Sequence, residues 1–289
     1  MTAAILGAYT PAGYQRRADD LDPRSVLNAS SFLTDVIRPR RSLLHHRAAA
    51  SAMSGPAPPP RGEVHVWTAP LPPRPELLAA FARVISPGEL RQAERSANPA
   101  YRAVQIASRG LRRLVLARYA AVDANALTFS RSPLGKPFLD PNHIDLRFNV
   151  THAGSVVACA VTTGAEVGID AEPLRDVPDA LDLAGRFFAP DERAALEALG
   201  AAERSRAFLT CWTRKEAYVK AVGAGLTHPL DSFCVSVRAD QPDWLRESGS
   251  GEPIGAWSLL PLQLDETHVG AVAVQGPGWT LRRFSWPVG

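Results

Sequence analysis

Two acidic side chains, Asp170 and Glu172, stand one residue apart at the end of a short apolar run. The run is typical of a β-strand, and residues i and i+2 of a strand project from the same face, about 6–7 Å apart. Like charges held this close repel each other unless a cation lies between them. Because hard divalent cations prefer oxygen ligands, the pair predicts a site for Mg²⁺.

A third acid, Glu216, lies in a segment with the spacing of a long helix. Three apolar residues share its helix face at spacings of three and four, so Glu216 is expected to point inward. They are Phe208, Trp212 and Val219. An ion pair with Lys220 is the alternative, but such a pair is worth only about 0.3–0.5 kcal/mol on a helix surface. We therefore expect Asp170, Glu172 and Glu216 to share one metal site.

Basic and polar residues near these acids indicate a substrate that carries phosphate. Lys215 and Lys220 flank Glu216, and although two lysines usually mark a solvated helix face, beside a metal site they suit a phosphate. Thr151 and His152 end a strand and could both donate to a phosphate, the alternative being ordinary turn residues.

An earlier helix carries Arg102 and Arg109, which are two turns apart and share a face. Paired guanidiniums suit bidentate recognition of phosphate, although a solvated face is the common alternative.

The elements that must position these residues come in two similar series. We expect helices over 75–84, 87–95 and 101–121, and in the second series over 190–199 and 203–222. Strands are expected at 64–67, 127–129, 146–151, 156–162, 167–172, 233–237, 256–260, 269–274 and 281–286, with the run from 146 to 172 forming an antiparallel meander.

A repeated spacing supports an internal duplication. Pro87 precedes Arg109 by the same distance that Pro190 precedes Trp212. We therefore expect halves at 61–165 and 166–289 with a ligand in the cleft between them. Residues 1–60 are rich in Ala, Arg, Ser and Pro and end in a proline-rich linker, which predicts a disordered arm.

Composition narrows the class of protein. The 289 residues include 46% apolar residues, enough for a core, and the net charge of +3 permits an acidic partner without demanding nucleic acid. Three cysteines lack CxxC spacing, which favours buried free thiols. No apolar run approaches the roughly 20 residues that span a membrane, and no signal peptide is visible. We expect a cytoplasmic monomer with neither a nucleic-acid nor a membrane partner.

Four segments carry a resemblance to a known family. They are Gly135–Leu139, Phe148–His152, Val167–Glu172 and Trp212–Lys220. In order and spacing they resemble the phosphopantetheinyl transferases of the large, pseudo-dimeric class, which activate polyketide and nonribosomal peptide synthetases. The resemblance covers about residues 62–286. Thr151 stands where Ser is commoner and Ala171 where Ile or Val is commoner, and neither departure alters an expected metal ligand.

The resemblance implies an α+β fold of two similar halves related by a pseudo-twofold axis, each an antiparallel sheet packed with a long helix. It places coenzyme A between them, with Mg²⁺ on its pyrophosphate held by Asp170, Glu172 and Glu216. The residues that it implies for the phosphates are Lys215, Lys220, Thr151 and His152. It places Lys136 and Pro137 near the adenine, and Arg102 and Arg109 on the 3′-phosphate. Glu216, or a metal-bound water, would be the base, and Lys220 would join it in catalysis.

The implied reaction is attack by a serine hydroxyl of an acyl, peptidyl or aryl carrier protein on the phosphorus that bears pantetheine, with adenosine 3′,5′-bisphosphate leaving. Carrier proteins usually present an acidic helix, which suits the charge of +3. One alternative is a Mg²⁺-dependent phosphohydrolase acting on a nucleotide pyrophosphate. Another is a non-catalytic coenzyme A binding module, which is disfavoured because a pure binder gains little from a repelling acidic cluster.

Overall fold

The computed structural model describes residues 57–225, 228–240, 243–255 and 257–287. The predicted arm therefore lies outside the described residues except for 57–60. The helices are α4 (Pro75–Val84), α5 (Pro87–Glu94), α6 (Pro99–Ala120), α7 (Ala180–Phe187), α8 (Pro190–Glu197) and α9 (Ala201–Val222). The strands are β1 (Glu63–Pro70), β2 (Phe129–Arg131), β3 (Pro137–Leu139), β4 (Leu146–Ala153), β5 (Val156–Thr163), β6 (Val167–Pro173), β7 (Phe233–Val235), β8 (Leu245–Glu247), β9 (Trp257–Pro261), β10 (His268–Gln275) and β11 (Thr280–Ser285).

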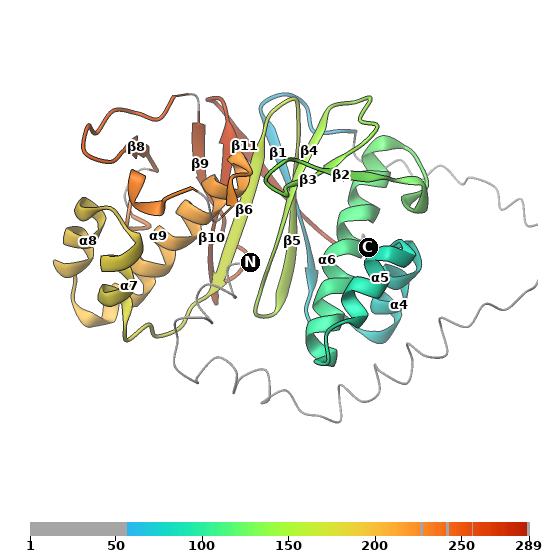
Figure 1. Cartoon of the computed structure of the whole chain (residues 1–289), viewed down its shortest axis with the longest axis horizontal. Helices are drawn as coiled ribbons and strands as arrows, with labels where there is room; N and C mark the ends of the chain where they lie inside the picture. The colour runs from blue at the N-terminus through green and yellow to red at the C-terminus, as the bar shows by residue number, and fades with distance from the viewer. Residues whose placement is uncertain (1–56, 226–227, 241–242, 256, 288–289) are drawn as a thin grey trace, which may run out of the picture.

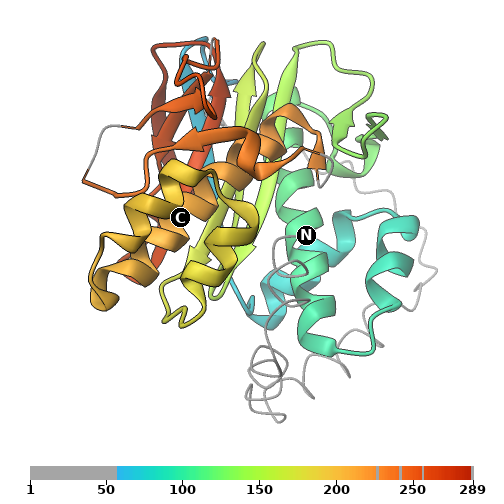
Figure 2. The same ribbon diagram turned by 60° about the vertical axis from the view of Figure 1, so that its left-hand side comes forward.

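The two main sheets lie between two groups of helices (Figure 1). Helices α4, α5 and α6 cover the outer face of the first sheet, and α7, α8 and α9 cover that of the second. Figure 2 shows the same layers from another side, with the cyan and green helices on one flank and the yellow and orange helices on the other. The predicted α+β class is confirmed.

Strand alternation explains how each sheet serves two cores. On β1, Val64 and Val66 pack between the two sheets, whereas Trp67 and Ala69 pack toward α6. On β6, Val167 and Ile169 join the layer between the sheets. The alternate residues of β6, including the two predicted acids, must therefore project toward the other side of their sheet.

The predicted duplication is visible in the topology. The second sheet has the order β6–β10–β9, and the first has the equivalent order β1–β5–β4, extended by β11. Helices α5 and α8 both have 8 residues, and α6 and α9 both have 22. The predicted halves are nevertheless interlocked, because β11 comes from the second half and pairs parallel with β1 in the first.

The predicted meander is wrong at its last strand. Strands β4 and β5 pair as expected, but β6 pairs with β10 and not with β5. Strand β4 instead meets β6 through side chains, since Asn149 Oδ1 accepts a hydrogen bond from the Ile169 backbone N–H at 3.2 Å. Helix α7 and strands β3 and β8 had no counterpart among the predicted elements.

A glycine brings β6 unusually close to α9. A Cβ atom on Gly168 would lie 2.0 Å from the carbonyl oxygen of Ala217 and 2.4 Å from the backbone nitrogen of Ala221. Only a residue without a side chain permits this approach. The close contact sets the position of the acids of β6 relative to the polar residues of α9.

Two further sequence predictions are confirmed. Helix α9 ends at Val222, as expected, and the φ of 75° at Gly223 is the left-handed conformation of a C-cap glycine. All three cysteines are buried and free. Among the helices that the structure describes, none combines the length and the apolar character that a membrane span requires.

Candidate active site

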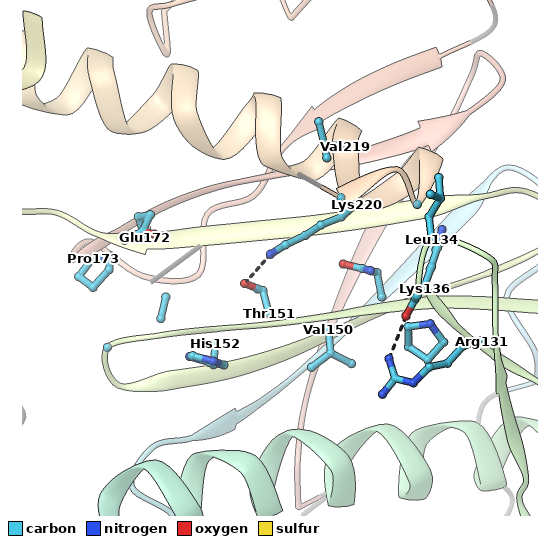
Figure 3. A pocket seen from close by; sticks show the side chains of 17 residues that line it. Arg131, Leu134, Lys136, Val150, Thr151, His152, Glu172, Pro173, Val219 and Lys220 are labelled. Carbon is cyan, nitrogen blue, oxygen red and sulfur yellow. Dashed lines mark hydrogen bonds between the residues drawn. The ribbon is translucent and has the colours of Figure 1, made fainter. Parts of the chain in front are cut away.

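A cavity of about 390 Å³ opens where the two halves meet. Four segments line it: the β2–β3 hairpin, the end of β4 with the turn that follows, the end of β6, and the end of α9 (Figure 3). Six residues predicted for the site are among its lining residues, namely Lys136, Pro137, Thr151, His152, Glu172 and Lys220. Segments that are far apart in the sequence therefore converge as expected.

The three predicted acids are all buried. Asp170, Glu172 and Glu216 have exposed fractions of 1%, 7% and 6%. Burial raises the pKa of Glu172 above its ordinary value, and the nearby charges of Asp170 and Glu216 raise it further. A cation among the acids would relieve this repulsion. Because the donors are all carboxylate oxygens, the set fits a hard divalent ion such as Mg²⁺.

The three acids do not yet have the arrangement of metal ligands. Across the described part of the chain, no three His, Cys, Asp or Glu side chains stand in an arrangement that could already hold a metal ion. Lys220 Nζ instead makes an ion pair with Asp170 Oδ1 at 2.6 Å, and Thr151 Oγ1 donates to the same oxygen at 3.2 Å.

Lys220 bridges the two halves beside the cavity. The sequence analysis offered an ion pair of Lys220 with Glu216 as the alternative, and in the structure Lys220 pairs with Asp170. The ammonium also donates to the Ile169 carbonyl oxygen at 3.3 Å and to Thr151 Oγ1 at 3.5 Å (Figure 3). It therefore lies among an acid, a hydroxyl and the cavity, where it can reach an anion.

His152 also lines the cavity, from the face of β4 opposite to that of the adjacent Thr151 (Figure 3). Burial lowers its pKa, and the charge of Lys220 lowers it further. The imidazole is therefore neutral at neutral pH and has one N–H group to donate.

Lys215 does not belong to this site, and its expected contact with phosphates is wrong. Its side chain is fully buried and pairs with Glu192 at 2.7 Å. The ammonium also donates to the carbonyl oxygens of Leu230 and Phe233, at 2.7 and 2.6 Å. These partners fill the donor capacity of an ammonium, so Lys215 joins α9 to α8 and β7 instead of binding substrate.

The first half contains the counterpart of this buried pair. The offset that relates Pro87 to Pro190 also relates Glu89 to Glu192 and Arg112 to Lys215. Arg112 and Glu89 form an ion pair as well. Each acid also accepts a hydrogen bond from the backbone N–H of the residue before its own helix, Glu89 from Ser86 and Glu192 from Ala189. The internal duplication was therefore the feature of the sequence from which the structural role of Lys215 could have been predicted.

The structure does not bring Arg102 or Arg109 to the cavity wall. Arg102 Nη1 donates to the Ser96 carbonyl oxygen at 3.2 Å, and Arg109 Nη1 donates to Gln105 Oε1 at 2.5 Å. A cation that the sequence analysis missed, Arg131, lines the cavity instead. Its place in the strand before the Gly135–Leu139 segment was the signal available for it.

Lys136 lines the cavity with its stem, while its ammonium is held elsewhere. The ammonium pairs with Glu166 at 2.6 Å and donates to the carbonyl oxygens of Ala221 and Val167 at 2.6 and 3.2 Å. Lys136 therefore ties the β2–β3 hairpin of the first half to the end of α9 and the start of β6. Burial lowers its pKa, and the charge of Glu166 opposes that effect.

The fold and the cavity agree with what family comparisons find. The family model of the 4′-phosphopantetheinyl transferase superfamily matches residues 166–273, and the model of the 4′-phosphopantetheinyl transferase N-terminal domain matches residues 69–164. The chain belongs to the 4′-phosphopantetheinyl transferase superfamily. The predictions of this family and of an enzyme are confirmed.

Named relatives support the same assignment. The chain is 36% identical over 219 residues to the 4′-phosphopantetheinyl transferase HetI of Nostoc, covering 75% of this chain and 90% of the relative. It is 32% identical to a putative 4′-phosphopantetheinyl transferase of Synechocystis, over 60% of this chain and 71% of the relative. It is 37% identical to the transferase Sfp of Bacillus subtilis, over 44% of this chain and 55% of that protein.

Proposed function

We propose that this protein transfers the 4′-phosphopantetheine group of coenzyme A to a serine of an acyl, peptidyl or aryl carrier protein and releases adenosine 3′,5′-bisphosphate. The observation that carries the proposal is the convergence of Lys220, Thr151, His152 and Glu172 on one cavity in a chain of this superfamily. Three of these side chains can donate to phosphate oxygens, and the fourth belongs to the buried acidic group.

The residues have different proposed roles according to where they lie. Lys220, Thr151 and neutral His152 bind the pyrophosphate, which orients the phosphorus for attack. Asp170, Glu172 and Glu216 would hold Mg²⁺, which when bound neutralises charge on the pyrophosphate. Glu216 is the proposed acceptor of the serine proton, and a base in this position typically contributes about 10²–10⁴-fold.

Binding of the phosphates must rearrange one contact. Lys220 pairs with Asp170 at 2.6 Å in the structure, so the ammonium has to exchange part of that contact for a phosphate oxygen. The exchange would free a carboxylate oxygen of Asp170 for the metal at the same moment that an anion arrives. We propose that metal and coenzyme A therefore bind cooperatively.

The test is incubation of the full chain with coenzyme A, Mg²⁺ and an apo carrier protein, with the mass of the carrier protein measured. The expected result is an increase by one phosphopantetheine group and stoichiometric release of adenosine 3′,5′-bisphosphate. Cleavage of coenzyme A without modification of acyl, peptidyl and aryl carriers would identify the phosphohydrolase alternative. Binding of coenzyme A with neither cleavage nor transfer would identify the binding module.

A further inference from the structure

The imidazole of His152 takes its position in the cavity wall from the backbone that carries it. Among the residues that the structure describes, none forms a hydrogen bond with this imidazole, whereas the adjacent Thr151 donates to Asp170. The position of His152 therefore depends on where the end of β4 is held. Ala153 is the last residue of β4, the turn to β5 begins at Gly154, and both residues also line the cavity.

A second histidine, His268, holds this turn from the other half of the chain. It is the first residue of β10, only 5% of it is exposed, and its Nε2–H donates to the Ala153 carbonyl oxygen at 3.1 Å. Its Nδ1–H donates to Asp265 Oδ1 at 2.8 Å. The hydrogen bonds from His268 and Thr267 lower the pKa of Asp265 to about 2, so its carboxylate is ionised and can only accept. The imidazole therefore donates from both ring nitrogens, which fixes its orientation.

The turn also packs closely against this end of the second sheet. A Cβ atom on Gly154 would lie 3.2 Å from His268 Nε2 and 3.2 Å from Pro173 Cγ, which is closer than ordinary van der Waals contact. Pro173 is the cross-strand partner of His268 and directly follows the acid Glu172. Figure 3 shows Pro173 and Glu172 near the tip of the hairpin that carries His152. His268 thus holds the end of β4 beside the strand end that carries an acid.

We propose that His268 is a positioning residue for His152. Its hydrogen bond to the Ala153 carbonyl oxygen holds the tip of the hairpin, and with it the His152 imidazole, at a fixed place relative to the acids of β6. The assignment rests on the proposed function, in which His152 binds the pyrophosphate of coenzyme A. The bond joins residues 115 positions apart in the sequence, so the pattern around neither residue indicates it.

The test compares two amide substitutions of different length. In His268→Gln the amide nitrogen can reach the place of Nε2 and still donate to the Ala153 carbonyl oxygen, whereas the shorter amide of His268→Asn ends near the place of Nδ1. Titration calorimetry of the full chain should show coenzyme A binding about tenfold more weakly to His268→Asn, which is the loss of one contact with a charged phosphate. His268→Gln should stay within about twofold of the parent, because it keeps the bond to the turn.

Asp265→Ala tests the same contact without opening a cavity in the core. Asp265 is 48% exposed, so its truncation frees the ring of His268 at little cost to folding. It should weaken coenzyme A about threefold, since the bond to the turn remains but its orientation is no longer fixed. This variant keeps the proposal testable if His268→Asn does not fold.

Two controls separate positioning from a general loss of stability. Leu259 is buried in β9 of the same sheet, outside the residues that line the cavity, so Leu259→Ala should lower the melting temperature without weakening coenzyme A. In a His152→Ala background, the further loss caused by His268→Asn should shrink to less than about threefold, because the residue that it positions is gone.

Several results would overturn the assignment. They are equal weakening by His268→Asn and His268→Gln, unchanged affinity in His268→Asn or Asp265→Ala, the same loss in Leu259→Ala, and an undiminished loss in the His152→Ala background. An affinity that depends on His268 as expected, without modification of any carrier protein, would refute the transfer reaction and leave the positioning role standing. Transfer to a carrier protein with unchanged affinity for coenzyme A in His268→Asn would refute the positioning role alone.

Discussion

Lys215→Met should cost stability and leave the affinity for coenzyme A unchanged. The substitution keeps the length of the side chain but removes the ammonium from Glu192, which is 1% exposed. Removing one partner of a buried ion pair typically costs about 3–5 kcal/mol, because the other charge stays buried without compensation. Glu192 keeps hydrogen bonds from the Ala189 and Val235 N–H groups, at 2.9 and 2.7 Å, so we expect a loss near 3 kcal/mol.

The assay is urea unfolding of parent and variant, with the affinity for coenzyme A measured by calorimetry under folding conditions. Glu192→Gln combined with Lys215→Met should recover part of the loss, since it removes the uncompensated charge. The duplicated site provides the control: in Arg112→Met, Glu89 keeps Arg113 at 2.8 Å and is 14% exposed. Its loss should therefore be smaller, about 1 kcal/mol.

One result would refute this reasoning. If Lys215→Met unfolds at the same urea concentration as the parent but binds coenzyme A at least tenfold more weakly, the ammonium serves the phosphates and not the core.

Three other substitutions test how the site is positioned. Gly168→Ala should lower both the melting temperature and the transfer rate, because the added Cβ would lie 2.0 Å from the Ala217 carbonyl oxygen. The control, Gly200→Ala, should change neither, because no atom lies within 4 Å of the position of its Cβ. Equal melting temperatures of the two variants would contradict this packing. Without divalent ions, the contribution of Glu172 to the free energy of unfolding should fall as the pH rises above 4.5, because its raised pKa lets the folded state keep the proton at a pH where the unfolded state loses it. Melting temperatures of Glu172→Gln measured over the same pH range should lack this decrease. Lys136→Met should raise the KM for coenzyme A more than it lowers kcat, and an unchanged KM would remove its role in holding the cavity wall.

Much of the secondary structure followed from local patterns. Proline at the helix starts and glycine at the end of α9 placed the helix boundaries within a few residues, because they act through the backbone next to them. The strand period also predicted that Asp170 and Glu172 share a face. Pairing between strands depends on distant segments, so neither the partner of β6 nor the parallel position of β11 could be predicted this way.

The errors at the site have a related cause. Helix α9 is buried around most of its circumference, so its pattern does not show which inward side faces the cavity. Glu216 and Lys215 are adjacent and both buried, yet they serve different neighbours. Arg102 and Arg109 share a helix face, but each guanidinium is oriented by contacts that this spacing does not show, to the Ser96 carbonyl oxygen for Arg102 and to the Gln105 and Gln92 side chains for Arg109.

The parallel pairing of β11 with β1 has a consequence for synthesis on the ribosome. Of the strands that the structure describes, the earliest in the sequence has the latest as its neighbour, with Glu63 beside Thr280 and Thr68 beside Ser285. One edge of β1 must therefore stay unpaired until β11 has been made, and an open edge is a site for wrong association between chains. We expect the nascent first half to need protection by chaperones, and termination of synthesis before β11 to damage the half that was made first.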